Sequence, residues 1–95
     1  MKPKNVRFSK STRRNKKYRV DFDYDGVHHV LHFGHTDYQH YRDSTGLGLY
    51  SDLDHNDKTR RKAYQRRARF IKNKAGELTV FDPLSANYWA FRFLW

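Results

Sequence analysis

A strictly alternating run from Tyr18 to Tyr24 places the strongest constraint on how this chain folds. Aromatic and aliphatic side chains occupy every second position, and charged side chains, mostly Asp, occupy the positions between them. A period of two is typical of a β-strand with one buried face. Asp25-Gly26 follows directly and supplies the positive φ angles of a tight type I′ turn. The sequence from Val27 to Phe33 then predicts the returning strand of a β-hairpin.

A lone hairpin is only marginally stable, so its apolar face needs a further strand or a helix packed on it. This face is expected to consist of Tyr18, Val20, Phe22, Tyr24, Val27, His29, Leu31 and Phe33. Aromatic residues make up 17% of the chain and are concentrated after residue 17. The core is therefore expected to be built from a few large rings.

Residues 53–76 predict the main helix. Asp54 or Asn56 can cap its N-terminus, and Gly76 can end it. Its apolar residues repeat at near-helical spacing and form a narrow stripe of Ala63, Tyr64, Ala68 and Ile71. The rest of the surface of this helix is strongly basic.

The C-terminal segment offers two more elements. Residues 78–81 have the composition of a third short strand, Asp82-Pro83 breaks the chain, and Ser85 can cap a final helical turn rich in aromatic residues. We therefore predict a small single α+β domain over residues 18–95. It consists of a β-hairpin, or a three-stranded sheet if residues 78–81 join it, packed by one basic helix and an aromatic C-terminal segment.

Positive charge is segregated into two blocks that contain no acidic residue. Residues 1–17 contain eight Lys and Arg, residues 58–74 contain nine, and the whole chain has a formal net charge of +10. Residues 1–17 have few apolar side chains, so they are expected to form an extended arm that is disordered alone and becomes ordered on a partner. A solvated tail is the alternative interpretation of this arm.

This charge distribution predicts a large acidic partner. The expected contacts with protein carboxylates or phosphates are Lys2, Lys4, Arg7, Lys10, Arg13, Arg14, Lys16, Lys17, Arg60, Arg61, Lys62, Arg66, Arg67 and Arg69. The expected apolar contacts are Tyr88, Trp89, Phe91, Phe93 and Trp95. No base-reading motif is present, so binding to nucleic acid would not depend on base sequence.

Residues suited to catalysis or metal binding are few. The chain has no Cys, and its six His lack the convergent spacing of a zinc site. The cluster from Asp54 to Asp57 could hold a magnesium ion for a nuclease, but its place at a helix start favours capping. We therefore expect no enzyme activity, no catalytic residues, no cofactor, no metal site and no small-molecule substrate. No apolar run is long enough for a transmembrane segment.

Several short motifs occur in a recognisable order. They are HFG at 32–34, YQHYRD at 38–43, DHNDKTRRKAYQRRAR at 54–69, and a Pro-x-Ser stretch that leads to LW at 94–95. In this order they resemble a family of small uncharacterised basic proteins of large nucleocytoplasmic DNA viruses. The core of the family pattern corresponds to His55, Asp57, Arg60 or Arg61, Tyr64 and Arg67, whereas Ala68 stands where that pattern often has His. The resemblance implies a viral origin and supplies no catalytic residues.

These observations leave two functions open. The first is a non-enzymatic virion structural protein, a minor capsid or capsid-associated component that binds neighbouring virion proteins through its basic arm, basic helix and aromatic C-terminus. The second is a sequence-independent nucleic-acid-binding protein that aids packaging or condensation of a viral genome. Both imply a location in the virion, with assembly in the host cytoplasm or nucleus.

Overall fold

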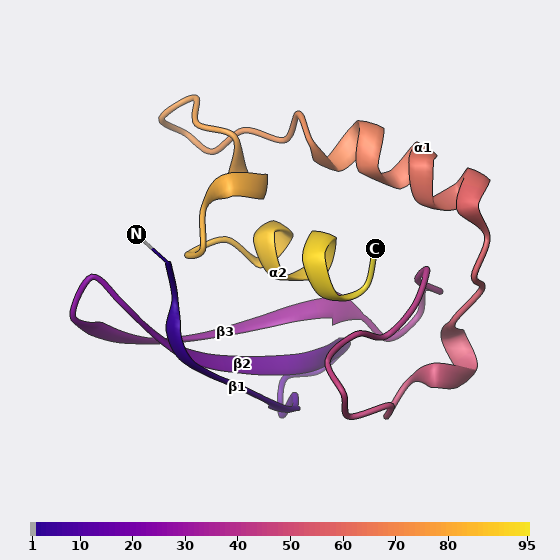
Figure 1. Cartoon of the computed structure of the whole chain (residues 1–95), viewed down its shortest axis with the longest axis horizontal. Helices are drawn as coiled ribbons and strands as arrows, with labels where there is room; N and C mark the ends of the chain where they lie inside the picture. Colours follow the sequence, from indigo (N-terminus) through magenta and orange to yellow (C-terminus); the bar gives the residue numbers. More distant parts are fainter. Residues whose placement is uncertain (1) are drawn as a thin grey trace.

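The computed structural model describes residues 2–95 and shows a three-stranded antiparallel sheet with two α-helices on one side of it (Figure 1). The strands are β1 (Lys4–Lys10), β2 (Lys16–Tyr24) and β3 (Val27–His35). The helices are α1 (Lys58–Ala68) and α2 (Ala86–Phe93), and two short 3-10 helices occupy Ser51–Leu53 and Thr79–Phe81. The predicted α+β class is confirmed.

The predicted hairpin is confirmed, with Tyr24 opposite Val27 at its closed end. Asp25 and Gly26 have φ angles of 53° and 75°, as a type I′ turn requires. Tyr18, Val20 and Phe22 are fully buried on one face of β2, so the alternating pattern identified the buried face of this strand correctly. On β3, Phe33 is buried as predicted, whereas Val27 is 56% exposed and does not belong to the core.

The third strand comes from a different segment than expected. The sheet order is β1-β2-β3, and β1 pairs antiparallel with β2 along the edge of the sheet. The description of residues 1–17 as an arm outside the domain is therefore corrected, because Lys4–Lys10 belongs to the sheet. The segment expected as a third strand contains the 3-10 helix Thr79–Phe81 instead.

Two features explain why β1 joins the sheet despite its polar composition. Phe8 packs its ring against Phe33, Trp89 and Phe93, at centroid distances of 6.0, 6.0 and 4.6 Å. Two basic residues of β1 also lie opposite acidic residues of β2, Lys4 opposite Asp23 and Arg7 opposite Asp21. An irregularity between Lys4 and Arg7 interrupts the alternation, which is why the pattern of a strand is weak there.

Helix α2 packs on one face of the sheet, and α1 packs on the side of α2 that faces away from the sheet (Figure 1). The side chain of Ser85 caps α2, as the sequence predicted, by accepting a hydrogen bond from the backbone N–H of Asn87. Trp89 is only 2% exposed, and its indole N–H donates to the Pro83 carbonyl at 2.9 Å. The expectation that Trp89 is a contact for a partner is therefore wrong, because its ring fills the core.

Gly34 shows why the HFG motif ends in glycine. Its φ angle is +79°, a region that side chains with a Cβ rarely adopt. A Cβ there would lie 2.9 Å from Leu94 Cδ1 and 3.1 Å from Lys17 Cβ. Glycine therefore lets the end of β3 approach both the residue after α2 and the start of β2.

Replacing Phe8 with alanine tests whether β1 is part of the folded domain. The Phe8→Ala variant is expected to lose about 2–4 kcal/mol of unfolding free energy, because the ring contacts three core aromatics. Urea unfolding followed by tryptophan fluorescence measures this loss. Ser9→Ala, at an exposed position of the same strand, is the matched control and should change the unfolding free energy by less than about 0.5 kcal/mol. Equal stability of the two variants would mean that β1 is not packed on the core.

Candidate functional site

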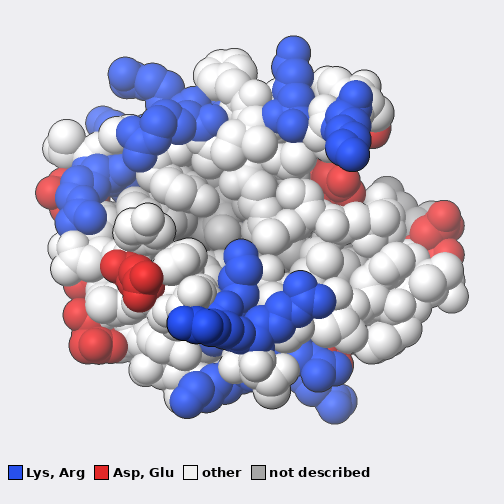
Figure 2. Space-filling view, turned by 180° about the vertical axis from the view of Figure 1, so that it is seen from behind, with Lys and Arg blue, Asp and Glu red and all other residues white. Residues whose placement is uncertain are grey.

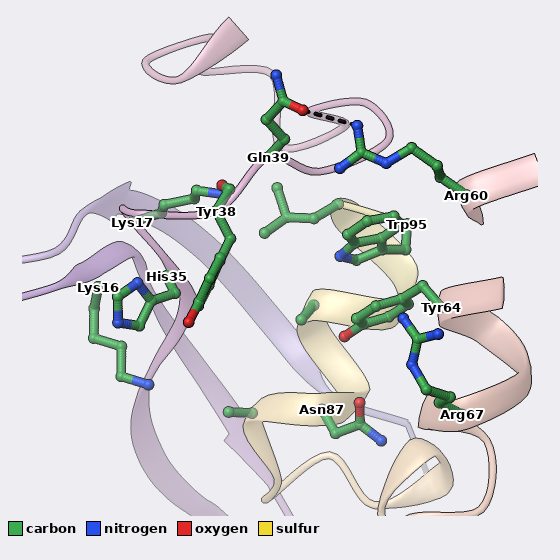
Figure 3. A pocket seen from close by; sticks show the side chains of 14 residues that line it. Lys16, Lys17, His35, Tyr38, Gln39, Arg60, Tyr64, Arg67, Asn87 and Trp95 are labelled. Atoms are coloured by element: carbon green, nitrogen blue, oxygen red, sulfur yellow. Dashed lines mark hydrogen bonds between the residues drawn. The ribbon is translucent and has the colours of Figure 1, made fainter. Parts of the chain in front are cut away.

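A cleft of about 470 Å³ lies between the end of the sheet and α1, with α2 beneath it (Figure 3). Lys16, Lys17 and His35 line it from β2 and β3, and Tyr38 and Gln39 line it from the segment after β3. The opposite wall comes from α1, and α2 with the two residues after it contributes Ala86, Asn87, Ala90, Leu94 and Trp95. The cleft thus joins segments that are far apart in the sequence.

The two basic blocks of the sequence meet at this cleft. Lys16 and Lys17 come from the first block, and Arg60 and Arg67 come from the second. His35 adds an imidazole ring whose Nδ1 accepts from the Asp37 N–H, and no Asp or Glu is among the lining residues. Figure 2 shows Lys and Arg side chains above and below a hollowed surface, with those at the upper left lying over α1. The site is suited to anions.

Aromatic rings stand on both sides of the cleft. Tyr38 is 66% exposed, and its ring contacts His35 at a centroid distance of 4.8 Å. On the other side, Tyr64 stacks on Trp95, with ring centroids 4.1 Å apart and planes 7° apart. Figure 3 shows Tyr38 on the sheet side and Tyr64 on the helix side of the same opening. The cleft therefore combines cations with flat apolar surfaces.

A buried polar chain supports the sheet side of the cleft. The Lys17 ammonium donates to the Tyr38 carbonyl at 2.7 Å and to His40 Nδ1 at 2.8 Å. His40 is fully buried, and its Nε2–H donates to Asp54 at 2.5 Å. Since Nδ1 accepts and Nε2 donates, His40 is neutral with its proton on Nε2. This chain fixes the backbone that carries Tyr38.

Burial determines the ionisation of this chain. Desolvation lowers the pKa of Lys17 from 10.5 to about 8, although the carboxylates of Asp43, Asp54 and Asp52 act in the opposite direction. Desolvation also lowers the pKa of His40, and the nearby Lys17 ammonium lowers it further. Lys17 is only 2% exposed, so the prediction that it contacts an external partner is corrected.

A second buried group holds the loop that follows Tyr38. The Tyr18 hydroxyl donates to Asp43 and accepts from the backbone N–H of Leu49. Burial and the hydrogen bond to Asp43 raise the pKa of Tyr18 to about 12. Asp43 also accepts from both the N–H and the hydroxyl of Thr45. The loop is therefore tied to the core by hydrogen bonds.

Helix α1 is attached mainly through its contacts with the last residues of the chain. Asp57 is its N-cap and accepts from Thr59 and Arg60, so the predicted caps Asp54 and Asn56 are corrected. Arg61 donates to the Trp95 carbonyl at 2.7 Å and lies over the Tyr41 ring. The helix ends at Ala68 rather than near Gly76, and the side chain of Asn87 caps the Ala68 carbonyl.

The structure separates the predicted contact residues into several groups. Arg60, Arg67 and Lys16 meet at the cleft. Lys62, Arg66 and Arg69 are exposed along or just after α1, and Lys2, Lys4, Arg7, Lys10, Arg13 and Arg14 are exposed on or beside β1. Arg61 is engaged within the fold, and of the apolar set Tyr88, Phe91, Phe93 and Trp95 are partly buried.

The sequence analysis did not identify His40, Tyr38, Gln39 or His35 as site residues. Nothing in the local pattern around Tyr38 indicates that its side chain lines a cleft together with residues of α1. Lys17 is predicted as a partner contact because it stands in the basic run of residues 1–17. Its position next to the first buried residue of β2 is the signal that could have shown its burial.

The described residues show no metal cluster and no membrane-spanning element. Within residues 2–95, no group of three or more His, Asp and Glu side chains could hold a metal ion. Over the same range, every helix is too short or too polar to cross a bilayer. Within the Asp54–Asp57 cluster, Asp54 accepts a hydrogen bond from His40 and Asp57 caps α1, whereas His55 Nε2 is buried without a hydrogen-bond partner among the described residues.

The chain has the architecture of an α+β protein with a cationic cleft, and comparison with known proteins adds a partial match. A family model described as a family of unknown function (DUF5754) matches residues 6–45. This range contains most of β1, all of β2 and β3, and the Tyr38 wall of the cleft, which is less than half of the chain. No curated protein and no solved structure matches the chain. The resemblance to viral proteins stays a prediction.

The buried Lys17 predicts a specific dependence of stability on pH. Between about pH 8 and 10.5 the unfolded chain binds more protons than the folded chain at Lys17, so this contribution to stability grows as pH rises. This pH-dependent contribution of Lys17 to the unfolding free energy is fully present above pH 10.5 and is lost as pH falls through about 8. The unfolding free energy of the wild type relative to Lys17→Met is expected to rise by at most about 1.4 kcal/mol per pH unit in this window.

Urea unfolding of both proteins at several pH values within this window measures the difference. Contributions from Tyr18 and the other groups are common to both proteins and cancel. Parallel stability curves for wild type and Lys17→Met would contradict the buried position of the ammonium group.

Proposed function

We propose that the protein binds nucleic acid without dependence on base sequence and that the cleft is the centre of its binding surface. The observation that carries this proposal is the meeting of two basic blocks, separated by some forty residues, at one cleft lined by Lys16, Arg60 and Arg67. An ordinary solvated helix face mixes charges of both signs, whereas α1 contains no acidic residue. Phosphates are the acidic partner that fits such a surface best.

The arrangement of the remaining cations supports the same function. Exposed Lys62, Arg66 and Arg69 extend the positive surface along α1 beyond the cleft. In contrast, the acidic residues of β2 pair with neighbours on the sheet, such as Asp21 with Arg19 at 2.7 Å. Acidic side chains are thus kept away from the lining of the cleft, and a phosphate backbone would meet mainly cations there.

Hydrogen-bonding groups that could read base edges are few. The cleft offers Gln39 and Asn87, but Gln39 accepts from Arg60 at 2.8 Å, and Asn87 donates to Ala68 and Thr79. The Gln39 side-chain carbonyl and the Asn87 side-chain NH2 group are therefore engaged within the protein. Binding governed by phosphates and by flat aromatic faces tolerates any base.

A double substitution across the cleft tests this function. Lys16→Gln with Arg67→Gln is expected to weaken binding of random-sequence single-stranded DNA about tenfold at about 150 mM salt and to reduce the salt slope by roughly 1.4. Neither side chain makes a hydrogen bond or an ion pair within residues 2–95, so folding should be unaffected. Fluorescence anisotropy across a salt series measures both quantities.

The matched control is Lys72→Gln with Lys74→Gln, which removes the same charge from the loop beyond α1. This control is expected to change the affinity by less than about twofold. Equal losses in the two double variants would show that net charge alone determines binding. Absence of binding by the wild type at about 150 mM salt would refute the function itself.

A second candidate is the assembly role, in which the protein binds neighbouring virion proteins. This role is favoured by three exposed apolar side chains in the segment of the chain that connects α1 to α2. They are Phe70, Ile71 and Phe81, which are 66%, 50% and 67% exposed. Exposed apolar residues of this kind are suited to contacts with another protein. Trp89 does not support this role, because its ring fills the core.

Cross-linking mass spectrometry on purified virions tests the assembly role. Lys72 and Lys74 follow Phe70 and Ile71 directly and are exposed, so they are expected to cross-link to a neighbouring virion protein. Presence of the chain in the particles without cross-links from these lysines to another protein would contradict the assembly role.

A further inference from the structure

We propose that the cleft holds an unpaired nucleotide of a single strand, with its phosphate among Lys16, Arg60 and Arg67 and its base stacked on Tyr38. This inference rests on the proposed function and adds a preference for single-stranded over double-stranded nucleic acid. It depends on the ring of Tyr38, on the shape of the cleft and on the placement of the cations.

The Tyr38 ring is exposed although a ring of this size is usually covered. It is 66% exposed and stands in a cleft lined by cations. Its only ring neighbour within residues 2–95 is His35, at an interplanar angle of 47°, so a broad part of the ring is open. An open aromatic ring among cations is the arrangement that single-strand-binding proteins use to stack bases.

The backbone at Tyr38 is fixed before any ligand binds. Its carbonyl accepts from the buried Lys17 ammonium at 2.7 Å, and its N–H donates to the His35 carbonyl at 3.2 Å. Lys17 is itself held by the hydrogen bond to His40. A ring on a fixed backbone loses little conformational freedom when a base stacks on it.

The dimensions of the cleft also favour one nucleotide. Its volume of about 470 Å³ lies within the usual range of about 300–1,000 Å³ for small-ligand sites. Figure 3 shows Arg60 and Arg67 on one side and Lys16 on the other, with Tyr38 between the sheet and α1. A base of an intact duplex would reach Tyr38 only after it is unpaired and unstacked. The free energy required for this step is smaller for a single strand.

Arg60 has donors left for a phosphate. Its Nη1 donates to Gln39 across the opening, and within residues 2–95 its other guanidinium nitrogens make no hydrogen bond (Figure 3). Arg67 makes no side-chain hydrogen bond within the same range, although it lines the cleft. Phosphate oxygens can therefore be bound by both guanidinium groups without disrupting the fold.

Binding of the full-length protein to three probes tests the inference. The probes are an oligothymidylate of about 10 nucleotides, an abasic strand with the same number of phosphates, and a duplex of equal length, at about 150 mM salt. The wild type is expected to bind the oligothymidylate about tenfold tighter than either of the other probes.

Substitutions at Tyr38 identify the source of this preference. Tyr38→Leu is expected to weaken binding of the oligothymidylate about tenfold and to leave the abasic strand and the duplex within about twofold. Tyr38→Phe keeps the ring and should bind like the wild type. Phe81→Leu is the matched control, because Phe81 is equally exposed and does not line the cleft.

The outcomes separate the inference from the function on which it rests. Equal binding of all three probes, or an equal effect of Tyr38→Leu on each of them, would overturn the stacking site and leave phosphate binding intact. Absence of binding to every probe would overturn both. Loss of oligothymidylate binding in Tyr38→Phe would show that the hydroxyl rather than the ring is required.

Discussion

The burial of Trp89 against the sheet is the interaction on which the rest of the structure depends. Its ring contacts Phe22 from β2, Phe8 from β1 and Phe93 from its own helix. Burying a side chain of this size contributes on the order of 2–3 kcal/mol, a large share for a small domain. Because α2 is fixed in this way, Trp95 is presented beyond its end, and the stacking of Tyr64 on Trp95 then holds α1 in place. The cleft exists because α1 rests on α2 and not on the sheet.

The sequence predicted the elements whose signals are local. Alternation from Tyr18 to Tyr24, the Asp25-Gly26 turn and the Ser85 cap depend on neighbouring residues alone, and each was identified correctly. The fold class followed from them. By contrast, β1 was missed because its membership depends on one ring, Phe8, meeting residues some eighty positions away, and because charge compensation by β2 is invisible in a local pattern.

The candidate site was predicted only in part. All of its Lys and Arg residues were predicted as contact residues, since the segregation of charge is visible in the sequence. Their convergence was not, because it depends on the packing order of sheet, α2 and α1. The role of Lys17 shows the same limit: a cation in a basic run is ordinarily solvated, yet this one lies under the Tyr38 backbone and pairs with a neutral His40. Only three-dimensional contacts distinguish a cation that binds a partner from one that positions the binding surface.

The irregular, basic edge strand has a consequence for association between copies. An exposed strand edge offers unpaired backbone groups to another chain, and flat regular edges tend to extend into larger sheets. In β1, the break in register between Lys4 and Arg7 and the positive φ angle of Asn5 interrupt that edge, and its Lys and Arg side chains repel a second copy. The proposed binding to nucleic acid would bring copies of the protein together at close range. The shape of β1 lets such crowded copies remain separate folded units instead of joining edge to edge.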